Sequence, residues 1–106
     1  MWVFLTDAFL SIVADRDDPK SLLVRARRSG DIERVFPRAE VRRAEEADYR
    51  FGAFLPRGEV QSVICARIGE IRYPSFMDAV EERDRHNSYF RVWDAMYRFQ
   101  SQAERE

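Results

Sequence analysis

Two arginines at alternate positions of a strand-like run are the residues of this sequence best suited to chemistry. Arg25 and Arg27 are separated by one alanine, and a period of two places both side chains on one face of a strand. A third arginine, Arg50, lies in a second strand-like run between two aromatic residues. A guanidinium presents a rigid fork of donors that suits a carboxylate or a phosphate. The spacing therefore predicts an arginine-bearing sheet face.

The charge of the chain is segregated around these arginines. Seventeen arginines and one lysine against nineteen acids give a net charge of -1, which argues against a protein that coats nucleic acid non-specifically. Residues 20–43 carry eight basic and three acidic residues, a local charge of +5. We predict a docking surface for an acidic protein or a phosphate backbone. Its residues are Arg25, Arg27, Arg28, Arg42, Arg43 and Arg50.

Two ordinary explanations of the arginines stay open beside this hypothesis. A GC-rich genome favours arginine over lysine, which accounts for their number but not for their clustering. Asp7, Asp15 and Asp48 can also pair with arginines of neighbouring strands, because opposite charges commonly face each other across a sheet. In that case the arginine face would already be neutralised.

Most aromatic residues are predicted to lie in the core. Tyr49 and Phe51 alternate with Arg50 and so face away from it, which argues against a platform on which bases stack. The last helix carries one apolar stripe that we also assign to the core, while two further aromatic residues stay available to a partner or a second subunit. The stripe is Tyr89, Trp93, Met96 and Tyr97, and the two available residues are Phe90 and Phe99.

Other reactive side chains are isolated from one another. The acids around Asp15 and Asp17 suit a divalent cation, but the proline that follows them favours a turn. His86 is the only histidine, and no nucleophile is tied to it by a motif. Cys65 borders an apolar helical stripe and is predicted to be a buried, inert thiol. The chain has no glycine-rich phosphate loop and no paired metal-ligand spacing, so we expect no enzyme, no cofactor and no metal.

The elements that position the arginines follow from the apolar pattern. Strands rich in β-branched and aromatic residues come first and helices with a 3.6-residue period come last. Residues 40–43 stay open as a short edge strand, and the polar segment 84–88 stays open as a turn or as part of the last helix. The predicted strands are 2–6, 9–15, 22–27 and 48–55, with 9–27 as a hairpin, and the predicted helices are 30–36, about fourteen residues from Pro56, one from Ser75, and 88–102.

This order predicts an α+β fold, with an antiparallel sheet of four or five strands and about three helices packed on one face. It is compatible with a ferredoxin-like variant. We expect one domain over 1–102 and a frayed tail over 103–106. A single cysteine, no signal peptide and no apolar run of membrane-spanning length predict a cytoplasmic protein without membrane contact.

Several segments together resemble a group of small bacterial and phage-borne proteins without an assigned activity. The resemblance covers most of the chain, implies a fold of this kind and a mobile-element origin, and transfers no catalytic residue. The segments are Phe9-Leu10-Ser11-Ile12-Val13, Arg16-Asp17-x-Pro19, Leu23-Val24-Arg25-Ala26-Arg27, Asp48-Tyr49-Arg50 and Tyr73-Pro74-x-Phe76.

The functional hypothesis is a non-enzymatic interaction protein of bacterial or phage origin, a monomer or homodimer, that binds and occludes a macromolecular partner. Small phage-encoded inhibitors, such as anti-CRISPR or anti-defence proteins, have this size. A protein partner is expected first, and a small nucleic-acid-binding module is the alternative. A small hydrolase or nuclease that uses Asp15, Asp17 or His86 is the third reading.

Overall fold

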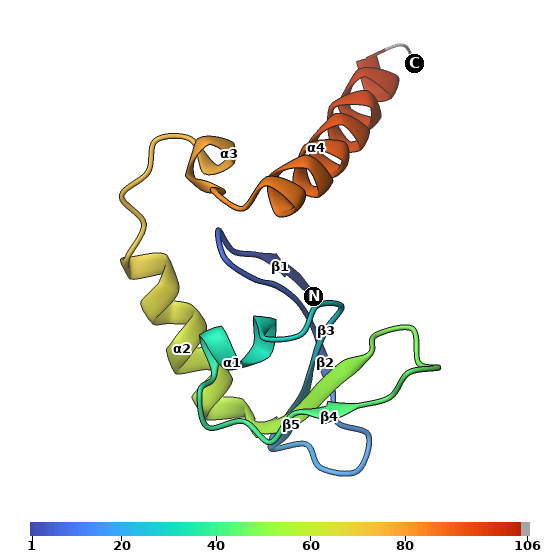
Figure 1. The fold of residues 1–106 in the computed structure, drawn as a ribbon, viewed down its shortest axis with the longest axis vertical. Helices are drawn as coiled ribbons and strands as arrows, with labels where there is room; N and C mark the ends of the chain where they lie inside the picture. The colour runs from blue at the N-terminus through green and yellow to red at the C-terminus, as the bar shows by residue number, and fades with distance from the viewer. Residues whose placement is uncertain (105–106) are drawn as a thin grey trace. The chain divides into compact units, whose positions relative to one another are not determined.

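The computed structural model describes residues 1–104 and shows an α+β protein with one five-stranded antiparallel sheet (Figure 1). Both the fold class and the antiparallel sheet were predicted, and both are confirmed. The strands are β1 (Trp2–Phe4), β2 (Phe9–Ala14), β3 (Ser21–Ala26), β4 (Arg42–Arg43) and β5 (Phe51–Pro56), and the helices are α1 (Asp31–Val35), α2 (Arg57–Gly69), α3 (Phe76–Ala79) and α4 (Arg83–Glu104).

The strands are ordered β1-β2-β3-β5-β4 across the sheet. The predicted hairpin over 9–27 is present as the antiparallel pair β2 and β3, and residues 42–43 form the edge strand that the sequence left open. β3 and β4 are joined through α1 and lie on either side of β5, antiparallel to it. This split βαβ unit is the feature that the fold shares with ferredoxin-like proteins. β2 pairs with the edge of β3 that faces away from β5.

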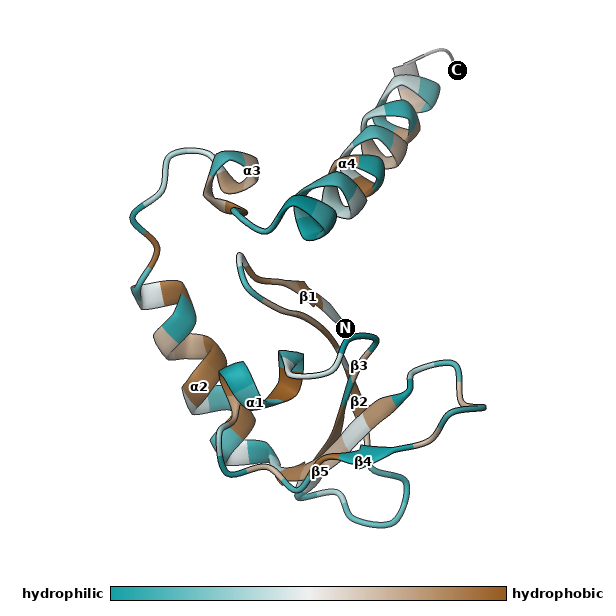
Figure 2. Ribbon diagram, in the orientation of Figure 1, coloured by the Kyte–Doolittle hydropathy of each residue, from teal (hydrophilic) through white to brown (hydrophobic). Residues whose placement is uncertain are grey.

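The core lies between one face of the sheet and the two helices α1 and α2. Alternation along the strands points one set of side chains inward, and Leu10, Val24 and Ala53 of neighbouring strands are buried there. Ile32 of α1 and Val60 of α2 belong to the same buried cluster. Both helices therefore cover the same face, and Figure 2 shows the apolar residues of the strands and of α2.

A buried carboxylate connects α1 to the sheet. Asp31 is 1% exposed, and its Oδ2 accepts a hydrogen bond of 3.0 Å from the backbone N–H of Phe9. Its Oδ1 accepts a second bond, of 3.2 Å, from Nη1 of Arg34. Gly30 precedes the helix with a φ of 93°, a left-handed conformation that costs glycine little. The loop from β3 thus turns sharply and returns α1 onto the core.

Residues from Tyr73 onward form a second compact unit. Ser75 caps α3, because its hydroxyl accepts a hydrogen bond from the backbone N–H of Asp78, as the sequence predicted. α4 begins at Arg83, so the polar segment 84–88 is helical and not a turn. The helix continues through Glu104, so the first half of the predicted frayed tail is helical, and residues 105–106 lie outside the described residues.

Candidate functional site: the open face of the sheet

One face of the sheet is covered by no helix of residues 1–72. The strand register aligns five of its residues in one row across all five strands. We call this the central row, and it consists of Trp2, Ser11, Arg25, Gly52 and Arg42. Strand spacing places the two arginines about 10 Å apart at the backbone, with the glycine between them. The open face therefore holds two guanidinium groups beside a floor without a side chain.

Apolar side chains flank the central row on both sides. Phe54 is 59% exposed and neighbours Leu23 across the β3–β5 pair. On the other side Phe4 and Phe9 lie opposite each other, with ring centroids 4.6 Å apart. Trp2 itself is 63% exposed, and its ring meets that of Phe9 edge-on at 5.9 Å. Exposed aromatic residues around arginine are typical of protein-binding surfaces.

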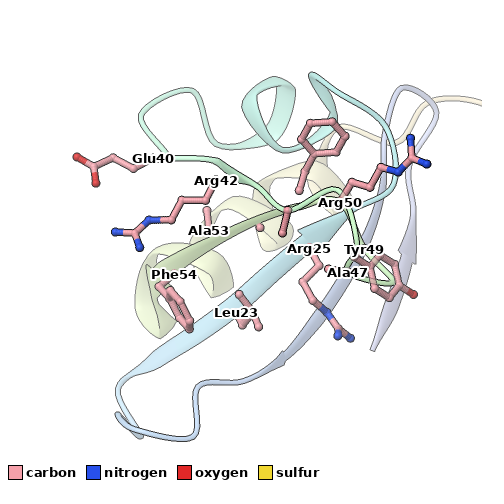
Figure 3. A pocket seen from close by; sticks show the side chains of 12 residues that line it. Leu23, Arg25, Glu40, Arg42, Ala47, Tyr49, Arg50, Ala53 and Phe54 are labelled. Atoms are coloured by element: carbon pink, nitrogen blue, oxygen red, sulfur yellow. The ribbon is translucent and has the colours of Figure 1, made fainter.

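A hollow of about 320 Å³ lies over β3, β5 and the loop that leads into β5. Figure 3 shows Leu23 and Phe54 at one end of the hollow and Arg25 with Tyr49 at the other. Arg42 and Arg50 also line it, and Glu40 is its only acidic residue. The hollow thus combines an apolar end with a positively charged end, which suits an apolar residue next to a carboxylate.

Tyr49 organises the charged end of the hollow. The guanidinium carbon of Arg25 lies 4.5 Å from the centroid of the Tyr49 ring, and that of Arg27 lies 4.0 Å from it. Each contact is a cation–π interaction. Tyr49 is buried, as predicted, but it precedes β5, which begins at Phe51. Its ring lies against the two arginines and outside the core cluster on which Phe51 packs.

Arg25 is held in place without being neutralised. Its Nη2 donates a hydrogen bond of 2.8 Å to the hydroxyl of Ser11, which is 1% exposed. Its Nε is buried and has no hydrogen-bond partner in the described residues. No carboxylate of residues 1–104 forms an ion pair with Arg25 or Arg42. These two arginines keep their charge for a ligand.

The remaining predicted arginines separate into three situations. Arg27 forms an exposed ion pair of 3.1 Å with Asp48. The hydrogen bond that its Nη1 donates to Oδ1 of Asp48 raises the pKa of Arg27 above its ordinary value. Arg43 pairs with Glu45 and lies over the Phe51 ring, on the opposite side of β4 from the central row. Arg28 and Arg50 are exposed in the bends next to β3 and β5, and Figure 3 shows Arg50 directed away from Arg25.

Of the three aspartates expected to pair with the predicted binding arginines, only Asp48 does so among the described residues, through its ion pair with Arg27. Asp7 instead receives two hydrogen bonds from Arg67 of α2, of 3.0 and 3.3 Å. The Oδ1 of Asp15 accepts a hydrogen bond from the backbone N–H of Asp17, so the Asp15 side chain stabilises the turn between β2 and β3. No group of acidic, histidine or cysteine residues that could hold a metal occurs in residues 1–104.

The other reactive residues lie away from the open face. Nδ1 of His86 is 3.3 Å from the backbone oxygen of Val80, near the beginning of α4. Cys65 of α2 is exposed, so the prediction of a buried thiol is wrong: the apolar stripe of α2 passes beside this position. No helix of the described residues has the length and apolar character that crossing a membrane requires.

Sequence reasoning missed Tyr49, Ser11 and Gly52 as parts of this site. Gly52 and Ser11 become functional candidates only through the register of neighbouring strands, which the sequence of a single strand does not contain. The alternation of Trp2 and Phe4 with Val3 was a usable signal, because it predicts two aromatic residues on the face opposite the core.

No protein-family model, curated protein or solved structure matches this chain. The resemblance to small bacterial and phage-borne proteins therefore stays a prediction.

Proposed function

We propose that this chain is a non-enzymatic binding protein whose open sheet face docks an acidic segment of a partner protein and thereby occludes it. The observation that carries the proposal is the central row, in which Arg25 and Arg42 flank Gly52 without a carboxylate partner of their own. A carboxylate above the glycine floor would accept charge-assisted hydrogen bonds from either guanidinium. The six predicted binding arginines reduce to these two as the principal contacts.

The apolar surroundings support a protein partner over a free anion. An apolar side chain next to the carboxylate would contact Leu23 and Phe54 in the hollow. Trp2 and Phe54 each expose more than half of their surface, and aromatic and arginine side chains dominate binding energy at protein interfaces. Occlusion needs no further chemistry, because the bound segment is covered by the sheet.

The experiment that tests this proposal uses a photoreactive benzoylphenylalanine in place of Phe54, with one in place of Ile68 on α2 as the control. Both residues are exposed, but only Phe54 lies at the hollow. We expect a protein to be cross-linked at position 54 in bacterial lysate and not at position 68. An acidic segment of that protein is then titrated against the purified chain by calorimetry.

The expected effect of Arg25→Gln or Arg42→Gln is at least tenfold weaker binding of that segment, because a hydrogen bond to a charged group contributes about 1.5–3 kcal/mol. Arg38→Gln is the matched control, since Arg38 is exposed and does not line the hollow. Equal affinity of the Arg25→Gln and Arg38→Gln variants would refute the assignment of the central row.

A second candidate function, binding of single-stranded nucleic acid, is favoured by the exposed ring of Trp2, which lies in the same row of the open face as Arg25, with Ser11 between them. Stacking of bases on such rings is a common mode of recognition. Tyr49 contributes little to it, because only 8% of its surface is exposed. A gel shift with oligo-dT at low salt that disappears steeply as salt is raised would favour this candidate, whereas no shift at low salt would exclude it.

A further inference from the structure

One side of α4 carries an exposed apolar surface, and none of its residues belongs to the open sheet face. Trp93 is 50% exposed, and three neighbouring apolar residues expose more than half of their surface. The prediction that most of this stripe is core is wrong, since of its four members only Tyr89 is buried. We call this surface the α4 stripe, and it consists of Phe90, Trp93, Met96 and Tyr97. Phe99 is exposed too, but it follows Phe90 by nine residues and so lies on the opposite side of the helix from it.

The rings of the α4 stripe are ordered along the helix. The ring centroids of Phe90 and Trp93 are 5.5 Å apart, and those of Trp93 and Tyr97 are 5.4 Å apart. Both pairs are stacked, so the aromatic side chains already support one another before any partner binds. Such ordering lowers the conformational entropy lost when a partner covers the surface.

The spacing within α4 is that of a helix pair. The seam positions alternate at intervals of four and three residues, which is the heptad pattern of helices that pack side by side. No seam position carries a charge. The charged residues Asp94 and Arg98 lie on the opposite side and pair with each other at 3.1 Å. The seam positions open to a partner are Trp93, Met96, Gln100 and Ala103, whereas Tyr89 begins the pattern but is buried and stacked on Phe76.

Charge and area identify the occupant of this surface. An uncharged stripe gains nothing electrostatic from an acidic or basic partner, and it meets a copy of itself without repulsion. Four large side chains with about half of their surface exposed, together with the exposed Gln100 and Ala103 of the same side, offer roughly 500 Å² per chain. Two copies would bury about 1,000 Å², which is the lower limit for a specific interface. A helix of 22 residues also gains most of its stability from packing of its apolar face.

We propose that the α4 stripe pairs with the α4 stripe of a second copy, which makes this protein a two-fold symmetric homodimer. An interface of this kind is isologous, because the same residues contribute from both copies. Gln100 at the seam favours the register in which its amide meets a polar partner, as polar seam residues do in helix pairs. The inference does not depend on the proposed function, because it uses none of the residues of the open face.

The two tryptophans of the chain allow a matched test, since one lies on each surface and both are half exposed or more. Sedimentation of the full chain from about 1 to 200 μM should show a monomer–dimer equilibrium in the micromolar range. Trp93→Glu should weaken dimerisation at least tenfold, and Trp2→Glu should leave it unchanged. A chain that stays monomeric throughout this range, or that dissociates on Trp2→Glu and not on Trp93→Glu, overturns the proposal.

A second measurement distinguishes loss of dimerisation from unfolding of the helix, which the Trp93→Glu variant alone would not do. In the Trp2→Phe variant the only tryptophan is Trp93, and its emission should shift to shorter wavelength as concentration rises, because dimerisation removes the indole from water. Met96→Glu in the same background should abolish that shift while leaving the circular dichroism of the helix intact, because Met96 is an exposed seam residue. An emission maximum that does not change with concentration contradicts the dimer even if the helix stays folded.

Discussion

Replacing Tyr49 by leucine tests whether the Tyr49 ring holds Arg25 and Arg27 in place. Leucine keeps apolar bulk but offers no aromatic surface to the guanidinium groups of Arg25 and Arg27, which lie 4.5 and 4.0 Å from the ring centroid. Each cation–π contact at such a partly exposed site contributes about 0.5–1 kcal/mol. The variant should therefore lose about 1–2 kcal/mol of unfolding free energy, which lowers the thermal midpoint by roughly 5–15 °C.

The assay is urea unfolding followed by fluorescence in the Trp93→Phe background, where Trp2 of the sheet is the only tryptophan. Tyr49→Phe keeps the ring and should lie close to the parent in stability. A double-mutant cycle of Tyr49→Leu with Arg27→Gln should give a coupling energy of about 0.5–1 kcal/mol. Equal stability of the leucine and phenylalanine variants would show that the ring does not support the arginines, and the reasoning would fail.

The ion pair between Arg27 and Asp48 provides the internal control for that experiment. Both side chains are about half exposed or more, and exposed pairs contribute about 0–1 kcal/mol. Asp48→Asn should thus cost less than Tyr49→Leu. The hydrogen bond that Arg27 donates to Asp48 raises the pKa of Arg27, so the guanidinium stays charged over the whole working range of pH and its cation–π contact does not titrate.

Three further predictions concern the scaffold. Asp31→Ala should lower the unfolding free energy by about 1–3 kcal/mol and speed hydrogen exchange of the Phe9 amide, whereas Asp31→Asn, which keeps an acceptor, should cost less. Gly30→Ala should cost about 1–2 kcal/mol through its left-handed backbone alone, because open space surrounds the added methyl group; an unchanged urea midpoint would contradict this. Cys65, being exposed, should react with Ellman's reagent in the folded protein nearly as fast as in urea, and a protected thiol would show that α2 is covered.

The strands and helices could be predicted because local patterns determine them. The hairpin over 9–27 and the capping serine at Ser75 follow from turn residues and periodicity, whereas the strand order stayed open. The site could not be predicted in the same way, because it depends on contacts between distant residues. The central row needs the register of β3 against β5 and of β5 against β4, and a shift of one residue would move Arg25 to the other face.

The aromatic residues show what a periodic pattern can and cannot predict. Tyr49 is buried, as alternation predicted, but it precedes the strand, which starts two residues later, and its ring lies against Arg25 and Arg27. The helical period correctly grouped Trp93 with Met96 and Tyr97, yet periodicity shows only that a stripe exists and not what covers it. In both cases the sequence contains the pattern but does not show which parts of the molecule surround these residues.

The two proposals together predict avidity. A dimer formed through α4 carries two open sheet faces, so a partner displayed at high density would be held by both at once, and the second contact would gain from a high effective concentration. Trp93→Glu should then weaken binding to a densely immobilised acidic segment by tenfold or more but leave binding to the same segment in solution unchanged. Arg25→Gln should weaken both. If Trp93→Glu weakened binding to the immobilised segment and to the soluble segment equally, α4 would contact the partner directly. If it weakened neither, the two copies would bind independently.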